Sequence, residues 1–452
     1  MTVDRRRLDA SVLLSVYVVL LLGIPSILVV KGVGAVGSPA TMFGLALLGW
    51  WSLTRVVPGM SDRSRQPLRR AVGFLIATVL VSYVAAGLRG YDGVEQRAAD
   101  RGLLAILSVA GVALVAADGL RSRRDLDRVL QWLVRLGAVM AVVGLGQFQG
   151  KLDIAALFRF VPGLTFNSDA GFVFTAGVRR VASTAGHPIE FGMILTVILP
   201  IALHRAFFAA PGRPRRRAWA LTALIGVGIP LSISRSAVVG LAVFAVILFP
   251  SWPRARRRSA YKVLPGFLVL IRLVAPGTLG TLKTGLLGIG NDPSVQGRTE
   301  DYAIVGRFIG ERPVFGRGFA TFLPDRYVLL DNQYIGLVVE LGVVGLTIML
   351  VLFATAIVLA VTARRRSLDA EARDLGMSLA AAVAIAASGL ATFDALGFAS
   401  ITGVMFLMFG CAGALWRLTP AAPRRTDAPD APNSPAESGS RVVSPTAVEV
   451  GV

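Results

Sequence analysis

Three arginines stand among small and polar residues, outside the long apolar runs of the sequence: Arg180, Arg235 and Arg298. Arginine is always charged, and its planar guanidinium donates parallel hydrogen bonds that match the oxygens of a phosphate. The three residues therefore predict contacts with an anionic headgroup or with a diphosphate.

Three further residues offer acid–base chemistry: His187, Asp331 and Glu340. His187 precedes a proline in a Gly-rich turn, where a general base or a phosphate contact would be accessible. Asp331 stands at the start of an apolar run, and a carboxylate there could deprotonate an attacking hydroxyl. The structural alternatives are a turn-stabilising polar residue for His187 and a helix N-cap for Asp331. Glu340 lies about two turns into the same run and is functional by default only if it faces the protein interior.

The sequence lacks the motifs of metal and nucleotide sites. It contains no His-x-x-x-His, Glu-x-x-His or Cys-x-x-Cys, and its single cysteine, Cys411, excludes a cysteine zinc site and an iron–sulfur cluster. The phosphate-binding loop of ATPases is absent as well. We therefore expect chemistry without a metal, a cofactor or ATP.

The composition is that of a protein with several membrane spans. Hydrophobic residues make up 54% of the 452 residues and charged residues 16%, against about 25% in soluble domains. The net charge of +20 would also suit a nucleic-acid binder, but such a protein carries its basic face on a polar domain. Here the charges lie between long apolar runs, so we expect no nucleic-acid partner and a polytopic integral membrane protein of the all-α class.

Twelve apolar segments are candidate transmembrane helices, since about 20 apolar residues cross a bilayer. They lie near residues 11–30, 40–57, 71–88, 102–118, 129–148, 190–208, 218–233, 236–250, 263–280, 338–361, 375–394 and 397–416. No convincing signal cleavage site follows the first segment, so we interpret it as a retained span. Most of the 47 Lys and Arg fall in alternate loops, and such an excess marks the cytoplasmic side. Both termini are therefore predicted to be cytoplasmic.

The chain divides into a membrane domain, residues 1–416, and a tail, residues 417–452. The tail is rich in Pro, Ser, Ala and Asp and has almost no large apolar residues. Such a segment cannot bury enough surface to offset its ordering entropy. We predict a disordered cytoplasmic tail that is dispensable for chemistry.

Two predicted connections are long, at residues 149–189 and 281–337, and both face outward in this topology. Long loops on a rigid scaffold commonly carry function. In the second, between the ninth and tenth spans, residues 298–312 place Tyr302 and three apolar residues on one face of an amphipathic helix. Arg180, Arg235 and Arg298 all fall on this outward side of the membrane.

Each of these arginines also has a structural interpretation. Arg180 could contact lipid phosphate, Arg235 could reach from a tight turn to the membrane surface, and Arg298 could cap the helix that follows it. Two other arginines, Arg135 and Arg272, lie within predicted spans, and the sequence alone does not pair them.

In their order along the chain, these residues resemble the O-antigen ligase and O-antigen polymerase family, which are membrane glycosyltransferases with a large outward loop between late spans. The resemblance covers residues 180–350. The matching pieces are Arg180 through His187-Pro188, the Ser234-Arg235-Ser236-Ala237 turn, Gly297-Arg298 leading to Pro313-Val-Phe-Gly316 and Gly318, and Asn332-Gln-Tyr334 through Glu340, Gly342 and Gly345.

The resemblance implies transfer of a glycan from a polyprenyl diphosphate carrier to a sugar hydroxyl, at the outer face of the bacterial cytoplasmic membrane. The partners would be the lipid-linked glycan, the acceptor glycan, the bilayer and other polysaccharide assembly proteins. The arginines would neutralise the departing diphosphate, and Asp331 or His187 would activate the acceptor. Asn332, Tyr334 and Tyr302 would position the acceptor or the loop.

Ligases of the family are similar to one another in having His where this chain has Asp331. A polymerase of a surface polysaccharide is therefore favoured, and a ligase with a carboxylate base stays open. The alternative of another class is a twelve-span transporter or flippase of lipid-linked oligosaccharide. Such carriers usually show paired repeats, whereas this sequence shows no repeat of fixed period. A non-catalytic scaffold is the third possibility, and it would tolerate loss of Arg235.

Overall fold

The computed structural model of the protein describes residues 9–31, 37–57, 65–150, 161–167, 173–175, 178–274 and 305–420. These residues include twelve α-helices of 14 residues or more: α1 (Ala10–Gly23), α2 (Pro39–Val56), α3 (Pro67–Arg89), α4 (Gly93–Gly119), α5 (Arg123–Phe148), α7 (Pro188–Phe208), α8 (Arg213–Leu231), α9 (Arg235–Ser251), α10 (Arg254–Val274), α13 (Gln333–Arg366), α14 (Ala370–Leu390) and α15 (Ala399–Leu418). Each apolar segment predicted from the sequence overlaps one of these helices, which confirms the helical fold class. Beyond Pro420 the predicted tail lies outside the described residues.

Seven of these helices are long and apolar enough to cross a membrane: α3, α4, α5, α7, α13, α14 and α15. The helices α1 and α9 are apolar but shorter. A multi-pass membrane protein is therefore supported, while the count of twelve spans stays a prediction.

The first predicted span, residues 11–30, is not one helix. The helix α1 ends at Gly23, and Leu28–Val30 forms the strand β1. This strand pairs antiparallel with β2 (Leu164–Phe166). Pro25 explains the break, because proline has no N–H to donate and disfavours the helical conformation of the residue before it. A second short sheet joins β3 (Val173–Thr175) to β4 (Val178–Arg180).

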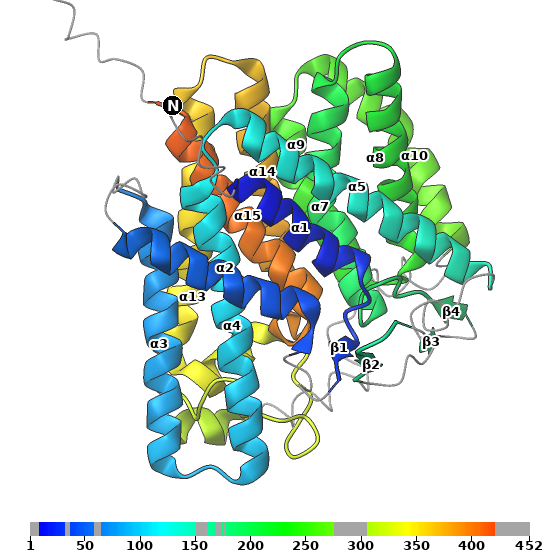
Figure 1. Ribbon diagram of the computed structural model, residues 1–452. Helices are drawn as coiled ribbons and strands as arrows, with labels where there is room; N and C mark the ends of the chain where they lie inside the picture. The colour runs from blue at the N-terminus through cyan, green and yellow to red at the C-terminus, as the bar shows by residue number, and fades with distance from the viewer. Residues whose placement is uncertain are drawn as a thin grey trace, which may run out of the picture. The chain divides into compact units, whose positions relative to one another are not determined.

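The helix α15 occupies the centre of the helical domain, in contact with α4, α13, α14 and α7 (Figure 1). Glycines on α15 make this close packing possible. A Cβ at Gly410 would lie 2.6 Å from the carbonyl oxygen of Ala113 on α4, well inside van der Waals contact. Small residues at such interfaces let helix backbones approach each other in membrane proteins.

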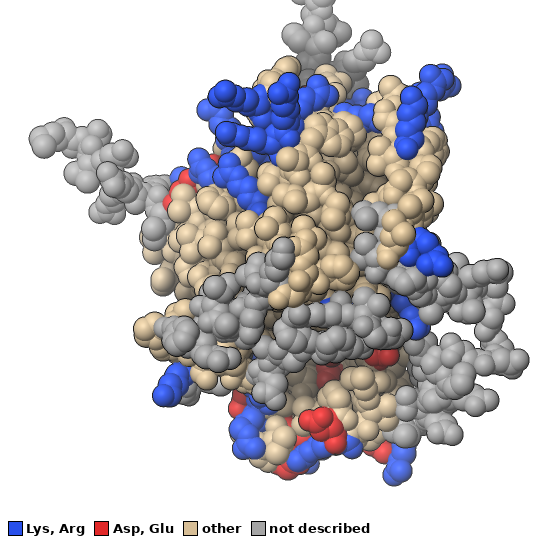
Figure 2. All heavy atoms as spheres, turned by 90° about the vertical axis from the view of Figure 1, so that its right-hand side faces the viewer, with Lys and Arg blue, Asp and Glu red and all other residues tan. Residues whose placement is uncertain are grey.

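Ion pairs and hydrogen bonds join many helix termini at one end of the domain, which we call the basic end. They comprise Arg55 and Arg69 with Asp118, His204 and Arg256 with Asp374, Arg205 with the Asp127 carbonyl, and Arg417 with the carbonyls of Ala117 and Leu120. Figure 2 shows Lys and Arg side chains gathered at this end, while acidic side chains lie mainly at the other. The sequence-based topology assigns the basic end to the cytoplasm.

Single cysteines will test that orientation. We expect Leu368→Cys, at a position that is 95% exposed at the basic end, to react with an impermeant maleimide only after lysis. Asp325→Cys, on an exposed residue of the opposite end, should react in intact cells. The native Cys411 is buried and should add little background. The reverse labelling pattern would invert the topology.

Candidate functional site

Two of the predicted arginines meet at the end opposite the basic end. Arg180 is the last residue of β4, and Arg235 is the first residue of α9, whose N-cap is Ser234. The Nε of Arg180 donates a 3.2 Å hydrogen bond to the carbonyl oxygen of Ser232, in the tight turn before α9. Burial and the nearby charge of Arg235 lower the pKa of Arg180.

These two guanidiniums have no anionic partner in the described part of the chain. Neither Arg180 nor Arg235 forms an ion pair there, whereas the buried Arg317 does. Arg180 is half-buried and Arg235 is exposed, so the pair reaches from the protein interior to its surface. Two adjacent positive charges without a carboxylate are suited to a phosphate or diphosphate ligand.

His187 lies next to this arginine pair and is the N-cap of α7. Its Nδ1 accepts a 3.2 Å hydrogen bond from the N–H of Ile189, and burial and the charge of Arg180 lower its pKa. A neutral imidazole whose Nδ1 accepts carries its proton on Nε2. His187 is therefore arranged to donate a hydrogen bond from Nε2, which fits a phosphate contact better than a general base.

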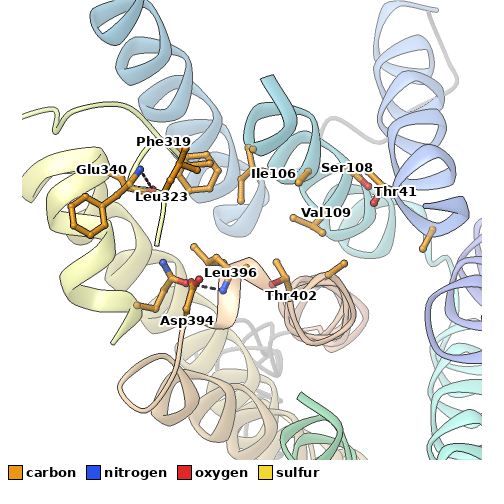
Figure 3. A pocket seen from close by; sticks show the side chains of 18 of the residues that line it. Thr41, Ile106, Ser108, Val109, Phe319, Leu323, Glu340, Asp394, Leu396 and Thr402 are labelled. Carbon is orange, nitrogen blue, oxygen red and sulfur yellow. Dashed lines mark hydrogen bonds between the residues drawn. The ribbon is translucent and has the colours of Figure 1, made fainter. Parts of the chain in front are cut away.

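A cavity of about 230 Å³ at the same end holds two carboxylates, Glu340 of α13 and Asp394 of the connection between α14 and α15. Figure 3 shows these two residues on one side of the cavity and Thr41 and Ser108 on the other. The remaining wall is mainly apolar. A smaller adjoining cavity shares Glu340 and Asp394 and also includes Asn332.

Glu340 faces the protein interior, which was the condition for a functional role. It is only 9% exposed, and its Oε1 accepts a 3.1 Å hydrogen bond from the N–H of Phe322. Burial raises the pKa of Asp394, the negative charge of Asp331 raises it further, and the N–H of Gly397 opposes the rise. Asp394 thus binds a proton more readily than an ordinary aspartate.

The N-cap of α13 is Asn332, so the alternative interpretation of Asp331 as the cap is wrong. The side-chain oxygen of Asn332 accepts from the N–H groups of Tyr334 and Ile335, at 3.0 and 3.4 Å. Asp331 is exposed beside it. The hydroxyl of Tyr334 donates to the carbonyl of Ala387 at 2.8 Å, which ties α13 to α14. Asn332 and Tyr334 therefore position the start of this helix.

The helix α13 is broken at Gly342. Residues 313–331, which precede α13 and which we call the outer segment, replace the backbone hydrogen bonds that the break removes. Gly342 has φ 69°, outside the helical region. The N–H groups of Arg317 and Gly318 donate to the carbonyls of Val339 and Glu340, at 2.9 and 3.0 Å. In return, the N–H groups after the break, on residues 343 and 344, donate to the carbonyls of residues 313 and 314. The outer segment and α13 therefore hold each other in place.

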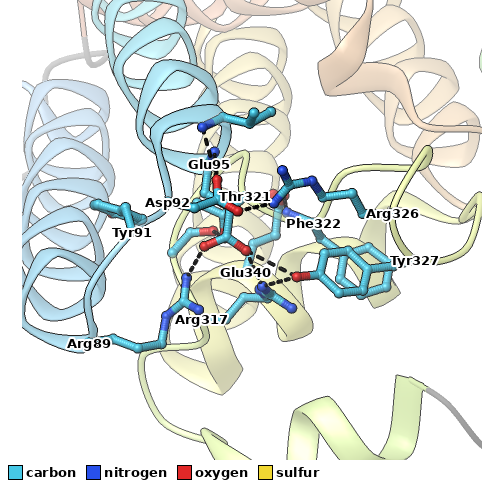
Figure 4. Close-up of polar contacts among 12 residues, drawn as sticks. Arg89, Tyr91, Asp92, Glu95, Arg317, Thr321, Phe322, Arg326, Tyr327 and Glu340 are labelled. Atoms are coloured by element: carbon cyan, nitrogen blue, oxygen red, sulfur yellow. Dashed lines mark hydrogen bonds and ion pairs between the residues drawn. The ribbon is translucent and has the colours of Figure 1, made fainter.

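Arg317 joins this outer segment to α4 through an ion pair with Glu95 (Figure 4). Its guanidinium lies 2.6 Å from Oε1 of Glu95 and 2.6 Å from the hydroxyl of Tyr327, and the side chains of the ion pair are 7% and 6% exposed. The Tyr327 ring stacks on Phe322, and the guanidinium lies 4.3 Å from the centre of the Tyr327 ring. Arg89 pairs with the other oxygen of Glu95 at 2.8 Å.

The predicted amphipathic helix is described only in part. Residues 305–311 are helical, and Val305 packs with Phe322 and Val339 in a small apolar cluster. Arg298 and Tyr302 lie outside the described residues. The structure thus brings Arg180, Arg235 and His187 together, and it leaves the third predicted arginine to experiment.

Asp394, Arg317 and Glu95 are not among the residues predicted from the sequence. Asp394 falls at the end of a predicted span, where an ionisable residue is itself a signal of function. The structure instead ends α14 at Leu390 and leaves residues 391–398 as a connection beside the cavity. The pairing of Arg317 with Glu95 spans more than 200 residues and has no local sequence signal.

Comparison with known families gives one match. The family model described as O-antigen ligase matches residues 220–350, which confirms the resemblance inferred from the sequence. Arg235, Asp331 and Glu340 lie inside the matched segment, whereas Arg180, His187 and Asp394 lie outside it. A comparison with curated proteins gives no match.

Loss of Arg317 should destabilise the protein, because Glu95 would keep only the less buried Arg89 as an ion-pair partner. A hydrogen bond to a charged group contributes about 1.5–3 kcal/mol, so we expect Arg317→Ala to lower the free energy of unfolding by that order in a detergent denaturation assay. Arg326→Ala is the matched control, since Arg326 pairs with Asp92 on the surface of the same segment. Equal losses in the two variants would contradict the role given to the buried pair.

Proposed function

We propose that this chain, which carries an O-antigen ligase domain over residues 220–350, transfers a glycan from a polyprenyl diphosphate carrier to an acceptor sugar hydroxyl. The match supports a surface polysaccharide ligase or polymerase. The observation that carries the finer proposal is the pair Arg180 and Arg235, two adjacent guanidiniums without a carboxylate partner in the described residues.

The arginine pair would bind the diphosphate of the donor. When the bond between the sugar C1 and the diphosphate oxygen breaks, negative charge develops on the diphosphate. Guanidiniums already placed at that position stabilise the charge without reorganisation. The Nε2–H of His187 would donate a further hydrogen bond to the same group.

The carboxylate cavity would bind the acceptor glycan. A hydroxyl oxygen of the acceptor attacks C1 of the donor sugar. The hydroxyl proton passes to a carboxylate, and the carrier diphosphate leaves. Glu340 and Asp394 both line the two cavities. Glu340 is buried within α13, whereas Asp394 lies on the connection between α14 and α15 and has a raised pKa. A base is most effective when its pKa approaches the operating pH, so we assign the proton transfer to Asp394, with Asp331 as the competing candidate.

The reaction would take place at the outer face of the bacterial cytoplasmic membrane. The arginine pair and the carboxylate cavity both lie at the end opposite the basic end, which the charge rule assigns to the cytoplasm. We favour a polymerase over a ligase because Asp331 stands where ligases of the family have His. Repeated elongation gives a ladder of products, whereas a ligase gives a single transfer.

Removal of either arginine should reduce turnover strongly. Loss of one such electrostatic contact costs about 10²–10³ in rate, and Lys should rescue poorly because it cannot form the bidentate contact. The assay is product formation by purified Arg180→Ala, Arg235→Ala and the matching Lys variants with lipid-linked glycan.

Arg258→Ala, which removes an exposed arginine at the basic end, is the control for net charge. Near-normal transfer by both Ala variants, at equal protein level, would refute the diphosphate site. Wild-type protein that moves the lipid-linked glycan across a bilayer but forms no product would favour the flippase class.

The pH dependence separates the two candidate bases. If Asp394 is the base, Asp394→Asn should nearly abolish turnover, and the acidic fall of kcat/KM should lie above the ordinary aspartate pKa of about 3.9. Asp331→Asn should then keep turnover and move that fall to lower pH, because removing the negative charge of Asp331 lowers the pKa of Asp394.

If Asp331 is the base, Asp331→Asn will instead nearly abolish turnover while donor binding survives. The loss could not be attributed to a missing cap, since Asn332 caps α13. Asp325→Asn, an exposed acid of the same outer segment, is the control. A chelator belongs in every assay, because we predict that activity is independent of metal; chelator-sensitive turnover would contradict this.

A further inference from the structure

A cavity of about 420 Å³ lies at the basic end, enclosed by α5, α7, α8 and the start of α14. Small-ligand sites typically occupy about 300–1,000 Å³. Three arginines line it, one from each of three helices: Arg135 of α5, Arg205 of α7 and Arg217 of α8. Nothing in the proposed glycan transfer uses this cavity.

The three arginines lack carboxylate partners in the described part of the chain. None of them forms an ion pair there, and Arg205 donates only to a backbone carbonyl, that of Asp127, at 3.2 Å. Arg213 and Arg215 of α8 are unpaired as well among the described residues, but they do not line the cavity; the three cavity arginines differ from them in facing one enclosed volume. Convergent guanidiniums without a counter-ion favour an anionic ligand.

The acidic residues around the cavity are largely committed elsewhere. Asp127 pairs with Arg123 at 3.2 Å. Asp374, the partner of the cavity residue His204, lies 2.8 Å from that imidazole and 2.6 Å from Arg256. Glu371 is the one lining carboxylate, among the described residues, without an ion pair. The lining therefore keeps an excess of positive charge.

The cavity lies beside surfaces that are suited to lipid. Val139 and Val142 of α5 are each 49% exposed, and Trp219 of α8, two residues after Arg217, is 39% exposed. Exposed valines on a transmembrane helix face the acyl chains, and tryptophan is enriched at the membrane–water interface. A ligand reaching these guanidiniums from the bilayer would carry its charge at the headgroup level.

We propose that this cavity binds the phosphate group of an anionic glycerophospholipid from the cytoplasmic leaflet. Basic pockets between transmembrane helices on the cytoplasmic side recognise such headgroups. The phosphate contacts Arg135, Arg205 and Arg217, and the glycerol and acyl chains extend along α5 and α8. The bound lipid links three helices at the end opposite the proposed site of glycan transfer.

Lipid retention on the purified full-length protein tests the proposal. The probes are dioctanoyl phosphatidylglycerol, dioctanoyl phosphatidylcholine and inorganic phosphate, and binding is measured by native mass spectrometry and by the shift in melting temperature. We expect phosphatidylglycerol to bind more tightly than phosphatidylcholine. Since a hydrogen bond to a charged group is lost, Arg217→Gln and Arg135→Gln should each weaken its binding by about tenfold.

Arg213→Gln and Arg215→Gln are the matched controls, because they remove the same charge from α8 outside the cavity. Unchanged binding of phosphatidylglycerol in Arg217→Gln and Arg135→Gln, or equal loss in the controls, would overturn the proposed site. Binding of inorganic phosphate alone, with the same dependence on Arg217 and Arg135, would overturn the assignment to lipid. The readouts do not involve glycan transfer, so the result is independent of the proposed enzyme activity.

Discussion

The exchange of backbone hydrogen bonds between residues 313–318 and the break in α13 is the constraint on which the candidate site depends. A backbone group left unpaired in a bilayer costs several kcal/mol, so a broken helix persists only where other groups replace the lost bonds. Here Gly316 and Gly342, both at positive φ, let the two backbones approach so closely that a Cβ on either would overlap the other segment. Glu340, two residues before the break, lines the cavity, and the outer segment forms part of the wall of the same cavity.

Carboxylates fix several basic side chains at both ends of the domain. Glu95 holds Arg317 and Arg89 at one end of the domain, and Asp118 and Asp374 hold four basic side chains at the other. A guanidinium with such a partner is a fixed part of the structure. Arg180 and Arg235 have no such partner among the described residues, and their proximity to each other is what makes them candidates for an anionic ligand.

Local patterns of the sequence predict the helices well, because apolar segments of about 20 residues are a strong signal. They also single out Arg180, Arg235, His187 and Glu340 as candidates, because these residue types are unusual in their surroundings. They fail where the outcome depends on which of two neighbouring residues makes a contact, as in the N-cap taken by Asn332 in place of Asp331. They fail again for Asp394, because the end of α14 is set by packing and the cavity is formed by segments far apart in the chain.

Glu190 connects the two halves of the proposed reaction. One of its carboxylate oxygens accepts from the N–H of Gly186, directly before His187, at 2.8 Å, and the other accepts from the N–H groups of Ser400 and Ile401, at 2.8 and 3.1 Å. A single buried side chain thus fixes both the turn beside the arginine pair and the start of α15, which follows the connection that carries Asp394. Transfer between two bound substrates depends on holding them within about an ångström of the productive geometry. In the proposed reaction, the arginine pair would stabilise the leaving diphosphate and Asp394 would accept the proton. Glu190 would then set the distance between the two elements without contacting either substrate.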